Sequence, residues 1–538
     1  MILNSSGLKD MKPWLEAGFE MPRFDREMVR ENTLKNPIWL HFGAGNIFRA
    51  FPAALQQKLL DEGKSDRGII VCEGYDYEII ERAYKPYDNL SVLVVLKHDG
   101  NMDKKVIASV VEALTADTGD KNNWQTLKNI FSNPSLQMVS FTITEKGYSL
   151  KNAKGEYYPD VESDFKAGPE SPKSFIAKLT ALCYERYKSG KYPVALVSMD
   201  NCSHNGSRLY EAVSTFAKEW AKNKLVDEGF VDYIENPEKV SFPWSMIDKI
   251  TPRPDMGVKE MLEKYGLEST ELIITSKNTY TAPFVNAEEP QYLVIEDLFP
   301  NGRPPLEEAG VIFTDRETVD KVEKMKVCTC LNPLHTALAV YGCLLGYNTI
   351  HDEMKDEQLK ALVEKVGYEE GLPVVINPGI INPKDFIKEV VEVRLPNPFM
   401  PDTPQRIATD TSQKLAIRFG ETIKAYQKRE DLNVKDLKYI PLVLAGWLRY
   451  LLAVDDEGKP FTLSPDPLME HLRKVTEGIK LGDKGPFDEK LRPILSDTSI
   501  FGVNLFEAGL ADKVLGYFEE LVQGPGAVRA TLKKYLQN

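Results

Sequence analysis

A buried strand that runs directly into a glycine turn and a helix is the feature that most restricts how this chain of 538 residues can fold. The strand covers residues 37–42, the turn carries Gly43 and Gly45, and apolar spacing predicts a helix over 47–63. A second buried strand, 68–72, follows and ends at an acidic residue. A strand, a glycine turn, a helix and a strand with a terminal acid together predict a βαβ unit that binds a dinucleotide.

The residues of this unit have separate roles in the prediction. Gly43 allows the tight turn, and Gly45 lets the backbone approach a pyrophosphate at the helix N-terminus. Glu73 or Asp76 would accept hydrogen bonds from the adenosine ribose, which favours NAD and leaves NADP as the alternative. The usual third glycine is absent, because Phe48 stands in its place. Further candidates for contact with the cofactor are Asn46, Ile47, Phe48 and Arg49.

The predicted secondary structure changes near residue 316. Before it, further strands are expected, among them 105–114 and 194–198, and polar loops close them. After it, helical segments dominate, such as 320–347 and 403–429. The sequence therefore predicts an α/β Rossmann-type N-terminal domain, with an N-terminal extension, over 1–315 and a mostly α-helical C-terminal domain over 316–538.

Composition narrows the function classes. The formal net charge of −13 disfavours a nucleic-acid partner, because phosphate backbones repel an acidic protein. The N-terminus has no signal-peptide pattern and no uninterrupted apolar run reaches about 18 residues, so no membrane partner and a cytoplasmic location are expected. The six cysteines have no second pair at ligand spacing, and we predict free thiols and no metal site.

An apolar run over 326–347 carries three polar side chains, those of Lys326, Asn332 and His335. Burying an ammonium group is costly unless it finds partners or loses its proton. Catalytic acid/base sites are one setting that justifies this cost. The run alone is equally consistent with a core helix that contains one satisfied histidine.

Several motifs, in order along the chain, resemble those of the mannitol dehydrogenase family of polyol-specific long-chain dehydrogenases. The resemblance extends from about residue 37 to beyond 425. The motifs are Gly-x-Gly-x-x-x-Arg-Ala (43–50), Thr-Glu-x-Gly-Tyr (144–148), Asp-Asn-x3-Asn-Gly (200–206), Met-Ile-Asp-x-Ile-Thr-Pro (246–252), Glu-Asp-Leu-Phe-Pro-Asn-Gly-Arg-Pro (296–304), Lys326 with Asn332-x-x-His335, and Arg406 to Lys414.

The resemblance implies a metal-independent NAD(P)-dependent dehydrogenase and assigns roles by position. It implies that Lys326 is the general acid/base and that Asn332, with Asn201, forms the oxyanion hole. It implies that a sugar chain is bound by His335, Arg406, Lys414 and Asn205. Asp248 would lie near the nicotinamide and position the histidine, Thr144 would lie on the cofactor side, and Glu145 would line the proton path.

The substrate is a small molecule, because the family divides among mannitol, other polyols and hexuronates. Arg406 with Lys414 could hold either hydroxyls or a carboxylate. The general resemblance and this cationic pair together favour reduction of D-fructuronate to D-mannonate. Tagaturonate reduction and mannitol 2-dehydrogenation are the alternatives within the family. Outside it stand a 6-phosphogluconate-dehydrogenase-like enzyme and an NAD-binding protein without activity. We expect a monomer or a homodimer.

One spacing departs from the family pattern. Asn332 is six positions after Lys326, where the family usually has five. On a regular helix this places Lys326 opposite His335, nine positions on. We therefore predict that the helix is irregular at 327–333, that Lys326 points to Asn332, and that Lys324 is the next candidate if this fails.

Overall fold

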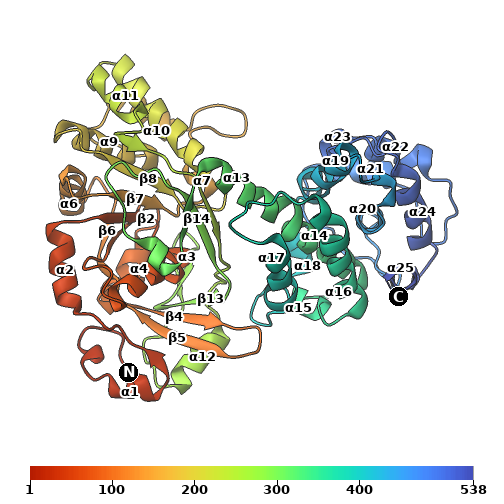
Figure 1. Cartoon of the computed structure of the whole chain (residues 1–538), viewed down its shortest axis with the longest axis horizontal. Coiled ribbons are helices and arrows are strands. Elements are labelled where there is room, and N and C mark those ends of the chain that lie inside the picture. The colour runs from red at the N-terminus through yellow and green to blue at the C-terminus, as the bar shows by residue number, and fades with distance from the viewer. Residues whose placement is uncertain (537–538) are drawn as a thin grey trace. The chain divides into compact units, whose positions relative to one another are not determined.

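The computed structural model describes residues 1–536 and divides the chain into two compact units. The first unit comprises Met1–Leu96 and Asn101–Asp320, and the second comprises Lys97–Gly100 and Lys321–Asn538 (Figure 1). The first is α/β and the second is mostly helical, as the sequence predicted.

A six-stranded parallel sheet forms the centre of the first unit, in the order β6-β3-β2-β7-β8-β9. This order is that of a dinucleotide-binding sheet, in which ligands bind where the order reverses, here between β2 and β7. The strands are β2 (Trp39–Phe42), β3 (Ile69–Glu73), β6 (Val110–Thr115), β7 (Met138–Phe141), β8 (Val194–Ser198) and β9 (Val240–Ser241).

Alternate side chains of these strands build two separate cores. Leu40 and Phe42 face one core, with α6 (Lys121–Ser132), α9 (Phe175–Lys188) and α10 (Asn205–Lys222). Trp39 and Val71 face the other core, with α3 (Asn46–Ala50), α4 (Pro52–Asp61) and α5 (Glu78–Ala83). Because both faces are covered, the strands read as continuous apolar runs in the sequence.

Two predicted elements of this unit are each interrupted. The helix expected over 47–63 breaks at Phe51, with φ −127° and ψ −74°, before Pro52 begins α4. Proline lacks the backbone N–H that would continue α3. The strand expected over 105–114 is two strands, β5 (Met102–Ile107) and β6, joined by Ala108 and Ser109.

Smaller sheets complete the first unit. The hairpin of β4 (Ser91–Leu96) and β5 lies between β13 (Phe284–Glu288) and the short β1 (Phe19–Glu20). The other two sheets are β10 (Ser245–Asp248) with β14 (Tyr292–Glu296) and β15 (Ile312–Thr314), and β11 (Ile273–Ile274) with β12 (Tyr280–Thr281). The chain also forms α7 (Thr144–Gly147), α11 (Glu228–Glu235) and α12 (Met256–Lys264).

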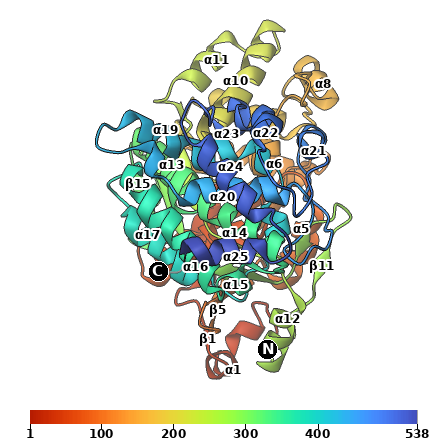
Figure 2. The ribbon, with the colours of Figure 1, turned by 90° about the vertical axis from the view of Figure 1, so that its right-hand side faces the viewer.

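Two almost fully buried helices, α14 (Asn332–Leu345) and α20 (Tyr439–Tyr450), lie at the centre of the second unit (Figure 2). The Tyr341 hydroxyl on α14 donates to the Leu442 carbonyl on α20 at 2.7 Å. Around them lie α15 (Ile350–Glu353), α16 (Glu357–Glu364), α17 (Pro383–Glu389), α18 (Pro404–Ile407), α19 (Glu421–Lys428), α21 (Met469–Thr476), α22 (Asp488–Leu495), α23 (Thr498–Phe501), α24 (Ala511–Leu521) and α25 (Ala527–Leu536).

Several helices of this unit contain a π-helical turn. The helix expected over 320–347 consists of α13 (Arg316–Met325), a π turn (Lys326–Cys330) and α14. The segment 403–429 is broken into α18, a 3₁₀ turn (Thr411–Gln413), a π turn (Ala416–Gly420) and α19.

One helical run, Arg316–Leu345, is long and apolar enough to cross a membrane by length and composition alone. Of its most apolar 18-residue window, 78% is buried inside the protein. A central core helix meets the same two criteria.

Candidate active site

The glycine turn after β2 has the geometry that the sequence predicted. Gly43 has φ +109°, and a Cβ there would lie 2.2 Å from the Thr142 carbonyl oxygen. Only glycine fits such a position. No atom lies within 4 Å of an ideal Cβ on Gly45, which leaves the backbone open to a bound group. This combination fits a dinucleotide pyrophosphate above the turn.

The acid at the end of β3 holds the turn in place. One carboxylate oxygen of Glu73 accepts from the Ala44 amide at 2.8 Å, and the other accepts from Tyr75 at 2.9 Å and Asp76 at 3.3 Å. Burial raises the pKa of Glu73, and these hydrogen bonds oppose the rise. The Asp76 carboxylate accepts from the Thr275 hydroxyl at 2.6 Å. Both acids thus already have protein partners, and their contact with a ribose stays a prediction.

Two exposed side chains near Glu73, those of Tyr75 and Lys277, were not predicted from the sequence. Tyr75 is 70% exposed, and the Lys277 ammonium lies 3.9 Å from the centre of its ring. Lys277 also donates to the Tyr75 carbonyl at 2.5 Å. Neither residue belongs to a motif, and they meet only because the β11–β12 hairpin returns to the end of β3.

Helix α3 is anchored by side chains that point away from the turn. Arg49 is 1% exposed and donates to the Ala282 carbonyl at 2.6 Å and the Thr281 hydroxyl at 2.8 Å. Phe48 is buried and stacks on His41, with 4.2 Å between ring centres. Burial lowers the pKa of His41 to about 3, so this ring is neutral. Both side chains therefore fix the helix, and contact of Phe48 and Arg49 with a cofactor stays a prediction.

Asp200, which follows β8, holds the turn that begins at Thr144. Its carboxylate accepts from the Ile143 and Thr144 amides at 2.9 Å each and from the Tyr148 hydroxyl at 2.5 Å. Thr144 has φ +67°, which a non-glycine residue adopts only under constraint. Burial raises the pKa of Asp200, whereas the three donors oppose the rise. The carboxylate thus fixes the backbone that carries Glu145.

Replacing Asp200 by Ala should lower the free energy of unfolding by about 3 kcal/mol, because three donors lose their acceptor. Urea unfolding followed by fluorescence measures this change. The matched control is Asp232→Ala, at an exposed position on α11, which should change stability by less than about 0.5 kcal/mol. Equal stability of the two variants would contradict the role given to Asp200.

The two asparagines of the 200–206 motif differ in their exposure to solvent. Asn205 is 0% exposed, its amide nitrogen donates to Ser198, Asp200 and Ser245, and its oxygen accepts from the Gly206 and Ser245 amides. The expected contact of Asn205 with a substrate is therefore not supported; it joins β8 to β10. Asn201 is exposed, and Asp248 lies buried at the end of β10. Their catalytic roles stay predictions.

The helix that carries Lys326 is irregular where the spacing predicted. Residues Lys326–Cys330 form a π turn, and the Leu331 amide donates to the Lys326 carbonyl, five residues earlier, at 3.1 Å. Leu331 has φ −133°, and α14 begins after it. A π turn holds one residue more than an α turn, so it absorbs the sixth position between Lys326 and Asn332. The prediction of an irregular helix is confirmed, and Lys326 is only 5% exposed.

His335 lies among charged groups in the second unit. Its Nε2 is 3.9 Å from a carboxylate oxygen of Asp402, which also pairs with Arg406. Burial lowers the pKa of His335 to about 4; Asp402 opposes this, and the nearby cations Arg394, Arg418 and Arg406 reinforce it. Lys414 donates to the Thr409 carbonyl, and burial and Arg418 lower its pKa. The structure thus gathers His335 and Arg406 from the predicted set.

Sequence reasoning missed three members of this cluster, Arg394, Asp402 and Arg418. Arg418 lies in the π turn Ala416–Gly420, and its Nη1 donates to the Thr336 hydroxyl at 2.6 Å. The Thr336 hydroxyl in turn donates to the Asn332 carbonyl at 3.0 Å. No sequence motif includes Arg418, and its contact with Thr336 on α14 joins residues that are 82 positions apart in the chain.

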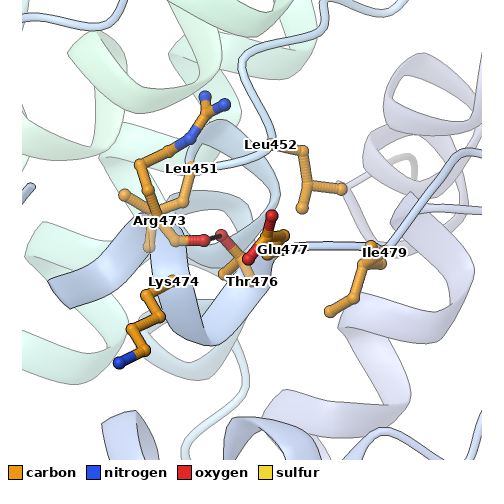
Figure 3. A pocket seen from close by; sticks show the side chains of 8 residues that line it. Leu451, Leu452, Arg473, Lys474, Thr476, Glu477 and Ile479 are labelled. Atoms are coloured by element: carbon orange, nitrogen blue, oxygen red, sulfur yellow. Dashed lines mark hydrogen bonds between the residues drawn. The ribbon is translucent and has the colours of Figure 1, made fainter. Parts of the chain in front are cut away.

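A cavity of about 350 Å³ elsewhere in the second unit contains none of the predicted residues. It lies beside α21, and Figure 3 shows Arg473 and Lys474 pointing to different sides. Because the two cationic groups point apart, they do not bind one anion together. This cavity carries no candidate chemistry. Among the residues 1–536, no group of three or more metal-ligating side chains is present.

Comparison with known proteins decides the family. Residues 37–308 match the mannitol dehydrogenase Rossmann domain, and residues 318–521 match the mannitol dehydrogenase C-terminal domain. The chain belongs to the mannitol dehydrogenase family. A D-mannonate oxidoreductase of Thermotoga maritima is 56% identical over 99% of both chains. A mannitol 2-dehydrogenase of Neosartorya fischeri is 29% identical and covers 94% of this chain and 93% of the relative.

Solved structures agree with this assignment. The Pseudomonas fluorescens mannitol 2-dehydrogenase ternary complex with NAD and D-mannitol is 26% identical, covers 100% of both chains and has a TM-score of 0.70. A substrate-free D-sorbitol dehydrogenase, 24% identical with a TM-score of 0.79, shares the fold. Membership of the mannitol dehydrogenase family removes the 6-phosphogluconate-dehydrogenase-like alternative.

The neutral state of His335 predicts a pH dependence in this member of the family. With an ordinary pKa of 6.5 and a folded-state pKa of about 4, the unfolded chain binds more protons between these values. The contribution of His335 to stability is therefore fully present above pH 6.5 and falls by up to about 3 kcal/mol as the pH drops from 6.5 through about 4. Denaturant unfolding at several pH values, compared with His335→Gln, isolates this contribution; identical profiles would contradict it.

Proposed function

We propose that this chain is an NAD-dependent D-mannonate oxidoreductase, which reduces the ketone of D-fructuronate to the secondary alcohol of D-mannonate. The observation that carries the proposal is a cation beside a neutral histidine: the Arg418 guanidinium donates to Thr336, lowers the pKa of His335, and has no carboxylate that raises its own pKa. A neutral polyol would leave the charge of Arg418 unbalanced, whereas a sugar acid brings a carboxylate. The 56% identity to a protein named D-mannonate oxidoreductase supports the same substrate.

The reaction needs a hydride, a proton and stabilisation of the alkoxide. The nicotinamide, when bound, supplies the hydride to the ketone carbon. Lys326, held at the π turn, gives its proton to the developing alkoxide oxygen and takes one back in the reverse direction. The amide groups of Asn332 and Asn201 donate hydrogen bonds to that oxygen. His335 and Arg406 hold the hydroxyls and the chain of the sugar acid.

The residues of the glycine turn fit the cofactor. Gly43 allows the tight turn, Gly45 leaves the backbone accessible, and Glu73 fixes the turn through Ala44. In this proposal the cofactor domain covers 1–315 and the substrate domain covers 316–538. A monomeric or homodimeric state and a cytoplasmic location remain expectations of the proposal.

The proposal is tested by incubating the protein with NADH and D-fructuronate. We expect NADH oxidation and a product that chromatography identifies as D-mannonate. D-Tagaturonate, assayed in parallel, tests the alternative hexuronate, because the cation cluster does not distinguish epimers. Faster turnover of D-tagaturonate, or no oxidation of NADH with D-fructuronate, would contradict the proposal.

A further inference from the structure

We propose that Arg418 binds the carboxylate of the substrate and so selects sugar acids over neutral sugars. This inference rests on the proposed function and names the part of the site that sets its substrate class. It starts from the position of the guanidinium, whose Nη1 bonds to Thr336, the residue after His335. Arg418 therefore lies at the first turns of α14, beside the residues expected to bind the sugar chain.

The charge of Arg418 has no protein counterpart among the described residues. Burial alone lowers its pKa, to about 10, and no neighbouring carboxylate raises it. At neutral pH the group is still a cation. Three other arginines of the same unit are paired with a carboxylate: Arg406 with Asp402, Arg429 with Asp431, and Arg529 with Asp356. A partly buried guanidinium without an anion is costly unless a ligand supplies one.

Two other buried arginines show how such a group is satisfied when its role is structural. Arg186 donates to five backbone carbonyls, and Arg449 donates to three. Arg418 makes one hydrogen bond, to a neutral hydroxyl, although a guanidinium has five N–H groups. Its remaining nitrogens are not among the fully buried, unpartnered side-chain atoms of residues 1–536, so they keep some exposure to solvent.

The chemistry of the substrate fits the planar guanidinium group of Arg418. In D-fructuronate the ketone lies at the opposite end of the carbon chain from the carboxylate. A guanidinium binds a carboxylate through two parallel hydrogen bonds, which fixes both position and orientation. Arg406 is less suited to this role, because its side chain is 63% exposed and already pairs with Asp402. Arg418 thus anchors the acid end while Lys326 and Asn332 act at the ketone end.

The test compares a charged and a neutral substrate in Arg418→Met. We expect kcat/KM for D-fructuronate to fall about 100-fold, since charge-assisted hydrogen bonds are lost, and kcat/KM for D-fructose to change by less than about threefold. Calorimetry should show that D-mannonate binding weakens by a similar factor. Arg429→Met, at an exposed arginine of the same unit, is the matched control and should leave both substrates unchanged.

A purely structural role for Arg418 predicts different results. Thr336→Val removes the hydroxyl that Arg418 contacts but keeps the charge, so it should spare the preference for the acid. Arg418→Lys keeps a positive charge, so it should retain part of the preference for the acid. This variant also serves as the test if Arg418→Met does not fold. The inference is wrong if Arg418→Met or Arg418→Lys lowers kcat/KM equally for D-fructuronate and D-fructose. It is also wrong if Thr336→Val lowers kcat/KM for D-fructuronate as much as Arg418→Met does. Failure of the unmodified protein to reduce D-fructuronate would instead overturn the proposed function.

Discussion

Replacing Lys326 by Ala should lower kcat for D-fructuronate reduction about 1,000-fold, because general acid catalysis contributes roughly 10²- to 10⁴-fold. The dissociation constant for NADH should stay within about twofold, since the glycine turn lies in the other compact unit. Stopped-flow turnover and fluorescence titration with NADH measure the two quantities separately. The same pair of measurements tests whether the chain is an enzyme or an NAD-binding protein without activity.

Lys324→Ala is the matched control for this experiment. Lys324 is an exposed lysine on α13, two residues before Lys326, and its loss should leave kcat within about twofold. Unchanged turnover in Lys326→Ala would contradict the acid/base assignment. A large loss in Lys324→Ala alone would transfer the role to that residue.

Replacing Asn332 by Ala should lower kcat about 100- to 1,000-fold, which is the usual cost of removing one oxyanion-hole donor. The helix should be preserved, because the Asn332 carbonyl, which accepts from Thr336, is part of the backbone and remains. The affinity for D-mannonate should change much less than kcat, since the amide acts on charge that develops in the transition state.

Asn377→Ala, at an exposed asparagine of the same unit, is the control for Asn332→Ala. A rise in KM with unchanged kcat would show that Asn332 only binds the ground state. The account also predicts that Asn201→Ala loses kcat in the same way. Full activity in Asn201→Ala would remove it from the oxyanion hole.

The sequence predicted the features that depend on local pattern. The βαβ unit followed from a strand, two glycines and an acid within residues 37–76, and the parallel strand order agrees with it. The irregular turn after Lys326 followed from one spacing, because helix geometry makes a shift by one residue visible as a rotation of about 100°. Both inferences used short stretches of chain with strong stereochemical limits.

The features that the sequence did not predict depend on tertiary contacts. Asn205 lies in the same motif as Asn201, yet it is sealed between β8 and β10 because β10 returns to it 40 residues later. Arg49 was a candidate for contact with the cofactor, but Thr281 and Ala282, more than 200 residues later, supply the partners of its side chain. Arg418 belongs to no motif, and only folding brings it to Thr336. Burial and partners, not residue type, separate these roles.

The ratio of kcat/KM for D-fructuronate to that for D-fructose, measured with NADH on the unmodified protein, tests the central claim most directly. The two ketones differ at the chain terminus, where one has a carboxylate and the other a hydroxymethyl group. The Arg418 cation beside Thr336 predicts a ratio of at least about 100, which corresponds to roughly 3 kcal/mol of selective binding. A ratio near one, or a preference for D-fructose, would contradict the account and indicate a polyol dehydrogenase.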